Sequence, residues 1–365
     1  DEQWGQRDFL GSTDERFRPV DAMNGPDGAL YIIDMYRGII QDDHFLTDEL
    51  REQIFERGLD TPIGKGRIWR VRHTGGKAGR EFTELASASG AELVAALAHE
   101  NGWVRDTAQR LLLKSTADIS GELTDIARGE NTVPALHAIW TLQGRGELQR
   151  DLVMELALVA DPHRQVQAVR AARGGALELE DLLQLGERSA GGSVALRMQL
   201  AVSLGDFAAQ EDAQLALLQL HREFADNAYL RQAVVRAVRG AELDFIQHLV
   251  NQQDLLAYSE GTAALLGAVT RSAYLSLRGP VDSTEPAPPA LLPLLELVAA
   301  QRDEREWMQV AMLAGLAEAP RVTGFTPAVL EGPPPIFADG TVDEDSPLWQ
   351  ARLDGRRAFT WPGDE

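Results

Sequence analysis

The chain has no cysteine among its 365 residues, and this absence excludes several kinds of chemistry from them. Disulfide bridges, thiolate catalysis, zinc ribbons, cysteine-ligated iron–sulfur clusters and covalently attached haem all require cysteine. The seven histidines are scattered along the sequence, and neither an HExxH nor a GxSxG motif is present. We therefore expect no metal site within these residues, and the motifs assign no catalytic residue.

Positive charge is scarce, because 35 lysines and arginines face 56 acidic residues and leave a net charge of −21. Proteins that bind nucleic acid or anionic lipid carry a basic stripe, so we expect neither partner. Long apolar runs are also missing. The longest, residues 289–300, falls short of the ~18 residues that a membrane span needs and contains Glu296. The composition, 44% hydrophobic and 25% charged, is otherwise typical of folded protein.

The first 75 residues are predicted to form β-structure and turns. Residues 20–23 and 29–34 are apolar runs of strand length on either side of a turn at residues 24–28, which indicates a hairpin. Residues 67–72 alternate polar and apolar side chains with the period of a strand. Residues 48–56 are polar and favour a short helix on a loop.

Three strands cannot bury a core on their own, so this part of the chain requires more sheet than its sequence supplies. The chain also starts without a methionine and without a signal-like segment. We therefore expect it to be an internal piece of a longer protein.

Residues 91–319 change in character and predict one helix after another, with a repeat of about 30 to 35 residues. Each copy has a polar turn residue followed by a helix with arginine and alanine at recurring places. The turn residue is expected to cap this helix, and the alanines to let neighbouring helices approach closely. The copies begin at Asn101, Asn131, Asp161, Gly192, Asn227, Glu260 and Arg305.

The copies resemble HEAT repeats, in which an Asp or Asn precedes a helix with the pattern V-R-x-x-A. Residues 101–108, Asn-Gly-Trp-Val-Arg-Asp-Thr-Ala, match that pattern best. The resemblance implies a mainly α-helical protein, an α-α solenoid of about seven helical hairpins. Two interpretations stay open for the recurring arginines: they line one face and bind a ligand, or they pair with acids of neighbouring repeats. They are Arg105, Arg170, Arg197, Arg231 and Arg236.

Composition divides the rest of the chain into connecting segments. Residues 76–90 form a glycine-containing linker between the β-segment and the helices. Residues 279–290 form a proline-rich insertion within the helical part. Residues 320–365 are expected to be an extended strap or a linker to a further domain.

Arg16 and Arg18 are the strongest candidates for a binding role. They lie two apart in a stretch that we expect to be extended, so they should project from the same face. Two guanidinium groups repel one another unless an acid lies between them. One solution is a ligand rich in carboxylates, held by bidentate hydrogen bonds. The other is a salt bridge to an acidic residue on a neighbouring strand.

The strings at residues 16–19, 26–32 and 67–71 resemble the closing blade of the β-propeller in soluble glucose and sorbosone dehydrogenases that depend on pyrroloquinoline quinone (PQQ). Residues 34–41 and 353–364 are similar to a subgroup of large secreted bacterial proteins that run from propeller through HEAT-like repeats to a cytochrome c domain. The resemblance implies that residues 1–75 are a C-terminal propeller blade and that Arg16 and Arg18 help hold the carboxylates of PQQ. It also implies calcium, and a haem c on a following domain.

Two functions therefore remain. In the first, the chain is part of a periplasmic or secreted quinoprotein-type sugar or alcohol dehydrogenase, and its solenoid links the propeller to a cytochrome c acceptor. The histidine base and the calcium loop of that family belong to earlier blades, so these residues cannot complete such an active site. In the second, the chain is a non-catalytic HEAT-repeat scaffold that binds a protein partner in a larger extracytoplasmic complex.

Overall fold

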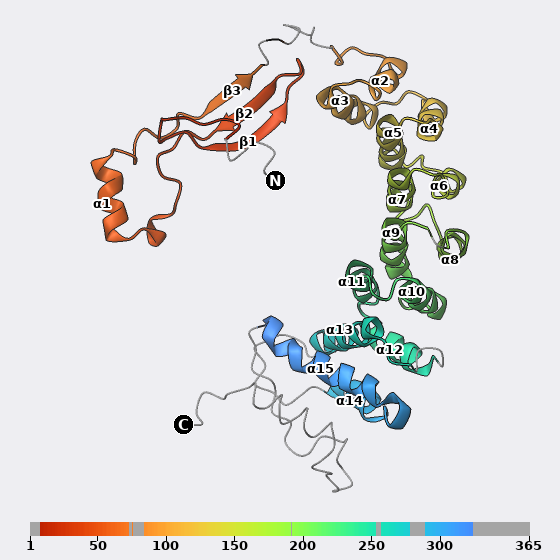
Figure 1. Ribbon diagram of the computed structural model, residues 1–365. Coiled ribbons are helices and arrows are strands. Elements are labelled where there is room, and N and C mark those ends of the chain that lie inside the picture. Colours follow the sequence, from red (N-terminus) through yellow and green to blue (C-terminus); the bar gives the residue numbers. More distant parts are fainter. Residues whose placement is uncertain are drawn as a thin grey trace. The chain divides into compact units, whose positions relative to one another are not determined.

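The computed structural model shows a mainly helical protein with a small three-stranded antiparallel sheet near its N-terminus (Figure 1). Its contacts divide the chain into two compact units, residues 1–147 and 148–365. Within the ranges described below, no helix combines the length and the apolar content needed to cross a membrane. The structure describes residues 8–72, 75, 84–190, 192–252, 257–277 and 289–323.

The sheet has the order β1-β2-β3, with β1 at Pro19–Asn24, β2 at Leu30–Asp34 and β3 at Arg67–Val71. The predicted hairpin is confirmed, because β1 and β2 pair antiparallel across the turn at residues 25–29. Gly28 has a φ of 74°, a backbone conformation that glycine adopts without steric cost. The Asp27 carboxylate accepts a hydrogen bond from the backbone N–H of Ala29 and closes the turn.

The sheet buries little of its own surface. Every residue of β1 is exposed, and on β3 the side chain of Ile68 is 70% exposed. Ile32 in the central strand is buried and pairs with Ala22 on one side and Trp69 on the other. Between β2 and β3 lie a 3-10 turn η1 (Asp43–Phe45) and the predicted helix α1 (Asp48–Glu56), which the Thr47 hydroxyl caps.

The first unit continues with four helices that pack in two consecutive pairs. In each pair the second helix starts at one of the expected repeat positions, after Asn101 and Asn131. Helix α3 also contacts α5, and α2 contacts α4, so the two pairs lie one upon the other. The helices are α2 (Gly90–Ala96), α3 (Gly102–Leu112), α4 (Ser120–Arg128) and α5 (Thr132–Gly144).

The second unit repeats this packing. Helices α7, α9, α11, α13 and α15 contact one another in turn, and so do α8, α10, α12 and α14. In this unit, each predicted repeat start is followed by a helix of the row formed by α7, α9, α11, α13 and α15. The bounds are α6 (Arg150–Leu156), α7 (Pro162–Ala171), α8 (Leu179–Arg188), α9 (Val194–Leu204), η2 (Gly205–Phe207), α10 (Glu211–Glu223), α11 (Ala228–Ala237), α12 (Glu242–Asn251), α13 (Glu260–Leu277), η4 (Pro289–Leu291), α14 (Leu292–Ala299), η5 (Asp303–Arg305) and α15 (Glu306–Thr323).

Most of the predicted caps are present. The side-chain oxygens of Asn101, Asp161 and Asn227 accept hydrogen bonds from the first backbone N–H groups of α3, α7 and α11. Asn131, in contrast, makes no side-chain cap on α5. The recurring alanines are buried as expected, because Ala108 and Ala168 have no exposed surface.

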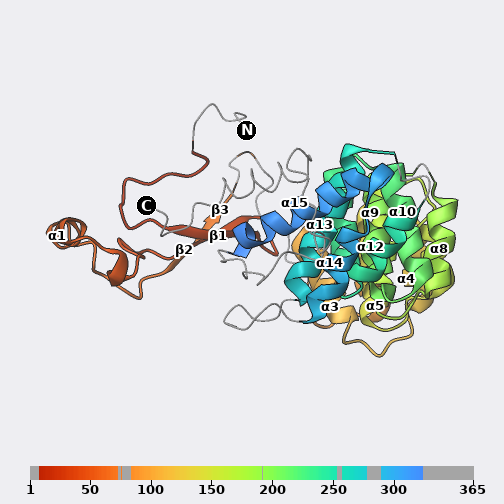
Figure 2. The same cartoon turned by 90° about the horizontal axis from the view of Figure 1, so that it is seen from below.

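Helices α13 and α15 lie side by side in both views (Figures 1 and 2). Their backbones approach closely where two glycines meet, since a Cβ atom added to Gly315 would lie 2.1 Å from the Gly267 carbonyl oxygen. Helix α15 continues to Thr323, so the strap does not begin at Pro320 as the sequence predicted. The fixed φ of proline, about −65°, is a helical value, and this residue costs the helix a hydrogen bond without ending it.

Parts of two predicted segments fall outside the described residues. Of the proline-rich insertion at residues 279–290, only the last two are described, in the turn η4. Of the strap predicted at residues 320–365, only the four residues in α15 are described.

Candidate functional site

Arg16 lies in a turn. The Asp14 carboxylate accepts a hydrogen bond from the Arg16 backbone N–H, and the Asp14 carbonyl accepts one from Phe17, which fixes a tight bend. The expectation that Arg16 and Arg18 share one face of an extended stretch is therefore wrong at Arg16. Its guanidinium group donates from Nε to the Thr61 carbonyl, at 2.9 Å, and from Nη2 to the Gly58 carbonyl, at 2.8 Å.

Arg18 directly precedes β1, and the buried carboxylate of Asp34 holds its backbone. Asp34 Oδ1 accepts hydrogen bonds from the N–H groups of Arg18 and Tyr36, and Oδ2 accepts one from the Trp69 indole. Burial alone would raise the pKa of Asp34. The three donors and the positive charge of Arg67 outweigh burial and lower it. The Asp34 carboxylate, at the end of β2, thus ties the start of β1 to the middle of β3.

The side chains of Arg16 and Arg18 hold two neighbouring loops together. Arg18 donates to the Phe17 and Gly38 carbonyls, at 2.9 and 3.2 Å. Gly38 lies against the backbone of Leu59, where a Cβ atom at position 38 would be 2.4 Å from the Leu59 carbonyl oxygen. Both arginines therefore donate to carbonyls around the same junction, between the loop after β2 and the loop after α1.

In this arrangement the side chains of Arg16 and Arg18 bind acceptors of the chain itself. Two nitrogens of each guanidinium group already donate to the carbonyls of the chain itself. A cavity of about 180 Å³ lies beside the same loops, lined by Arg37, Gly38 and Asp60 among others, but neither Arg16 nor Arg18 lines it. Across the described ranges, no three His, Asp or Glu side chains are grouped as metal ligands. The assignment of Arg16 and Arg18 to PQQ stays a prediction from the sequence.

The recurring arginines of the helices mostly hold the turns that precede them. In four helices the residue four positions after the N-cap is a long donor, and its side chain binds the carbonyl six residues earlier. A fifth donor, Arg197, has the same position in α9 but binds a different carbonyl, that of Gly186 in α8. The four are Arg105 to His99, Gln165 to Val159, Gln214 to Ala208 and Arg231 to Ala225, at 2.7, 2.6, 2.8 and 2.9 Å.

Two further positions complete this picture. Arg170, on α7, donates to the Gln199 side chain on α9. One interpretation expected such arginines to pair with acids of neighbouring repeats, and Arg170 does contact the neighbouring repeat, but its acceptor is an amide. His137 is half-buried, and its Nδ1 lies 2.8 Å from Gln109 Oε1. Burial lowers its pKa, with the nearby Arg105 charge acting in the same direction and Asp106 opposing both. These contacts lie between neighbouring helices and give both residues a packing role.

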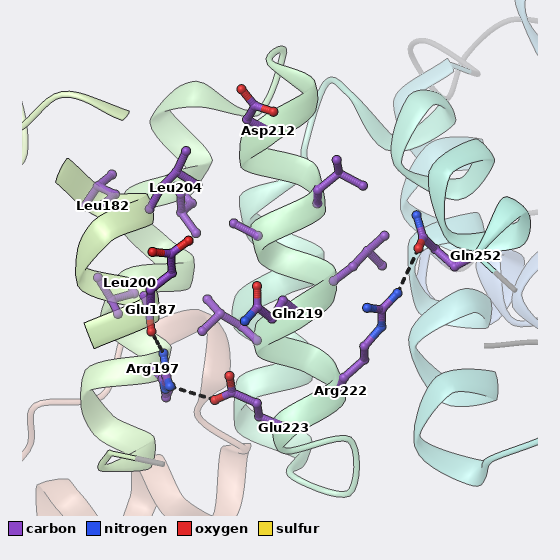
Figure 3. A pocket seen from close by; sticks show the side chains of 16 residues that line it. Leu182, Glu187, Arg197, Leu200, Leu204, Asp212, Gln219, Arg222, Glu223 and Gln252 are labelled. Carbon is purple, nitrogen blue, oxygen red and sulfur yellow. Dashed lines mark hydrogen bonds and ion pairs between the residues drawn. The ribbon is translucent and has the colours of Figure 1, made fainter. Parts of the chain in front are cut away.

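A groove of about 300 Å³ lies in the second unit, between α8 and α10 and above α9 (Figure 3). Its floor consists of buried leucines, among them Leu182, Leu200 and Leu204. Exposed polar side chains form its rim, with Glu187 contributed by α8 and Asp212 by α10. A volume of this size is at the small end of ligand pockets, which span roughly 300–1,000 Å³.

An ion pair lies inside the groove. The Arg197 side chain is completely buried, and its Nη2 lies 2.8 Å from Glu223 Oε2 (Figure 3). The angles of this contact do not make a hydrogen bond, and Arg197 Nε has no hydrogen-bond partner either. Burial lowers the pKa of Arg197, and the charge of Glu223 partly offsets the effect. The groove thus contains a desolvated cation with incomplete hydrogen bonding.

Three acidic side chains line this groove, and two of them lack a partner among the described residues. Neither Glu187 nor Asp212 takes part in a hydrogen bond or ion pair through its carboxylate. The third, Glu223, is only 26% exposed and contacts Arg197 through one oxygen. The exposed cation of the rim, Arg222, donates to Gln252 at 3.0 Å.

Sequence reasoning missed this groove. Arg197 was recognised as a recurring arginine, but Glu187 and Glu223 lie on two other helices, and their approach depends on the packing angles of α8 and α10. The one signal in the sequence is Gly186, a helical glycine. A Cβ atom there would meet no atom within 4 Å, so this position faces open space.

The fold and the sites define a mainly helical protein with a two-row packing of helix pairs in each unit. Residues 1–75 match a family described as a domain of unknown function, DUF7133. This segment contains the sheet and α1 and none of the helices α2–α15. No curated protein and no solved structure matches the chain.

Proposed function

We propose that the chain is a scaffold whose helices form a HEAT-like α-solenoid that binds a protein partner. The observation that carries this proposal is the recurring clamp at the fourth residue of the helices, repeated in both units. This clamp fixes the turn against the start of the helix in four helices, and such a recurring contact is expected where similar helical hairpins repeat along a chain. Such arrays expose long surfaces and rigid grooves between neighbouring helices, which suit them to binding other proteins.

The exposed apolar side chains of the sheet support the same proposal. With both edges unpaired among the described strands and Val20, Met23 and Ile68 half or more exposed, it has the composition of a sheet that another element covers. We propose that it closes a larger β-domain, as the resemblance to a propeller blade implies. The helices would then connect that domain to a partner.

Cross-linking within cells that produce the protein tests the scaffold directly. A photoreactive amino acid placed at exposed positions of the helices, such as Gln219 and Tyr229, should yield a specific covalent adduct with one protein. The same residue at Ile68 should yield an adduct within the β-domain or with a different chain. If the helix positions give no adduct while the sheet positions do, the helices are not the binding surface and the proposal is wrong.

The sequence strings at residues 16–19 and 67–71 favour the second candidate, part of a periplasmic or secreted quinoprotein-type dehydrogenase. In that case the helices would lie between the β-domain and a cytochrome c. When bound, PQQ accepts a hydride from the substrate, and Arg16 and Arg18 would have to exchange their backbone acceptors for its carboxylates. The test is reduction of an artificial electron acceptor by the longer protein with an aldose, after PQQ and calcium are added. No reduction and no binding of PQQ would exclude this candidate.

A further inference from the structure

The groove between α8 and α10 combines an apolar floor with carboxylates at its rim. Leu183 and Leu215 are partly exposed in the groove and offer a surface for methylene groups, above leucines that are buried. Glu187 and Asp212 line the groove from two different helices without partners among the described residues. A long side chain with an apolar stem and a cationic head matches both features, because such side chains bury their stems and keep the head at a polar rim.

The ion pair below the rim adds a third carboxylate. Arg197, fixed by the Gly186 carbonyl and by burial, holds one oxygen of Glu223 at 2.8 Å. The other oxygen, Oε1, has no partner among the described residues, so it can accept from a donor that enters the groove. The buried arginine in this way positions Glu223 and neutralises part of its charge.

The charges of the groove select the sign of the occupant. Three carboxylates and two cations line the groove, and one of the cations, Arg197, is completely buried and paired with Glu223. Glu187 and Asp212 therefore outweigh Arg222 among the remaining charges, and the groove favours a cation. A guanidinium group has five N–H donors in a planar fork, which allows it to bridge two carboxylates at once. The net charge of the chain, −21, also favours a basic partner on approach.

We infer that this groove binds an arginine side chain of the partner protein, flanked there by apolar residues. The inference rests on the proposed scaffold function and names the surface that the scaffold uses. The guanidinium group pairs with Glu187 at the rim and with the free oxygen of Glu223, which lie at the Arg197 end of the groove. Asp212 lies at the other end of α10 and adds to the negative charge of the rim, and the methylene stem lies on the partly exposed leucines. One buried side chain of this type often contributes much of the affinity of an interface.

The test uses a fluorescein-labelled peptide with the sequence Gly-Ser-Leu-Arg-Leu-Ser-Gly and the 365-residue chain. A second peptide carries citrulline instead of arginine, which has nearly the same shape and no charge. Fluorescence anisotropy should show at least about five-fold tighter binding of the arginine peptide at low salt, and the difference should shrink as salt screens the charges. Equal binding of the two peptides would overturn the inference.

Two pairs of variants locate the binding. Glu187→Gln with Asp212→Asn should reduce the affinity for the arginine peptide at least about three-fold. Glu122→Gln with Asp125→Asn removes the same charges from exposed positions on α4 and should leave it unchanged. Equal losses in both double variants would mean that net charge alone attracts the peptide, and would also overturn the inference.

A steric variant gives an independent readout. Gly186 lines the groove and Gly121 lies on α4, and a Cβ atom at either position meets no atom within 4 Å. Gly186→Leu should abolish binding of the arginine peptide, and Gly121→Leu should not change it. If Gly186→Leu binds normally, the groove is not the site. The scaffold proposal would still stand if the photoreactive helix positions captured a partner, so the two failures can be told apart.

Discussion

Apolar side chains are buried in the helices of this chain and largely exposed in its sheet. Among the helices, side chains such as Leu200 and Phe245 are completely buried, whereas in the sheet Ile68 and Met23 are 70% and 51% exposed. Two individual arginines, one from each region, differ in the same sense. Arg145 is 9% exposed and donates to three backbone carbonyls and to Glu147, while Arg57, which follows α1, is 53% exposed and pairs with Glu15.

The contrast shows which part of the chain is stabilised by packing against its own residues. Stacked helix pairs bury their apolar faces against the next pair, so the helical part gains stability from each added neighbour. The three strands have no second layer among the described residues, and their apolar side chains remain available for another element. The predictions that follow test this difference, beginning with the largest expected effect.

Removing a large side chain should be costly in the helices and nearly neutral in the sheet. Phe245→Ala leaves a cavity in α12, and we expect a loss of about 3–5 kcal/mol in the free energy of unfolding. Ile68→Ala should change it by less than about 1 kcal/mol. Urea titration of both variants of the full chain measures the difference. Equal losses would mean that the sheet contributes as much packing as the helices.

The buried His221 should make the helical part sensitive to acid. Burial lowers its pKa to about 4, and the charges of Arg231 and Arg222 add to the effect. Because the unfolded chain binds the proton near its ordinary pKa of 6.5, stability is complete above that pH and is lost progressively as pH falls towards 4. The shift corresponds to about 3 kcal/mol.

His221→Gln should remove this contribution, so its stability should fall less than that of the wild type between pH 7 and pH 4.5. His163→Gln, at an exposed position of α7, is the matched control and should follow the wild type. Urea titrations at a series of pH values provide the comparison. An unchanged pH dependence in His221→Gln would show that this imidazole is not desolvated in the native state.

Replacing an arginine should reveal which of the two regions depends on its hydrogen bonds. Arg145→Met leaves the carbonyls of Ser115 and Ala117 without their donor and removes one of the two donors to Leu112, so we expect a loss of about 2–3 kcal/mol. Arg57→Met removes an exposed ion pair and should cost less than about 1 kcal/mol. Thermal unfolding followed by circular dichroism distinguishes the two, and similar costs would contradict the account.

The smallest effect concerns the contact between the sheet and the first helices. Asn101 caps α3 and also donates from Nδ2 to the carbonyls of Gly25 and Pro26, at 2.9 and 3.2 Å. Asn101→Ala should cost about 1 kcal/mol and accelerate hydrogen exchange in the turn at residues 25–29. Asp161→Ala removes the cap of α7 and an ion pair with Arg164, neither of which involves that turn, and should leave its exchange unchanged. Faster exchange there in both variants would assign the effect to global loosening.

Patterns in the sequence were enough to predict the elements, and local chemistry decided the departures from them. The hairpin was predicted from two apolar runs around a turn, β3 from a period of two, α1 from its polar residues, and the later helices from the repeat. The extended stretch at Arg16 was wrong because the carboxylate of Asp14 competes for its backbone N–H. The strap was predicted to begin at residue 320, whereas α15 continues to Thr323.

The groove could not be predicted, because it depends on tertiary packing. Arg197, Glu187 and Glu223 come from three helices, and no spacing in the sequence indicates that they line one cavity. Arg16 and Arg18 were selected by motif, and the structure places their guanidinium groups on backbone carbonyls. Sequence patterns therefore located the arginines, while the acceptors of their hydrogen bonds were set by packing.

Hydrogen exchange of the full chain, followed by mass spectrometry, tests most directly whether the helices support themselves and the sheet does not. The account predicts that the amides of β1, β2 and β3 exchange at least about a hundred-fold faster than those of α9 and α12, because the helices open only in larger cooperative units. Equal protection of the sheet and the helices in the isolated chain would contradict the account.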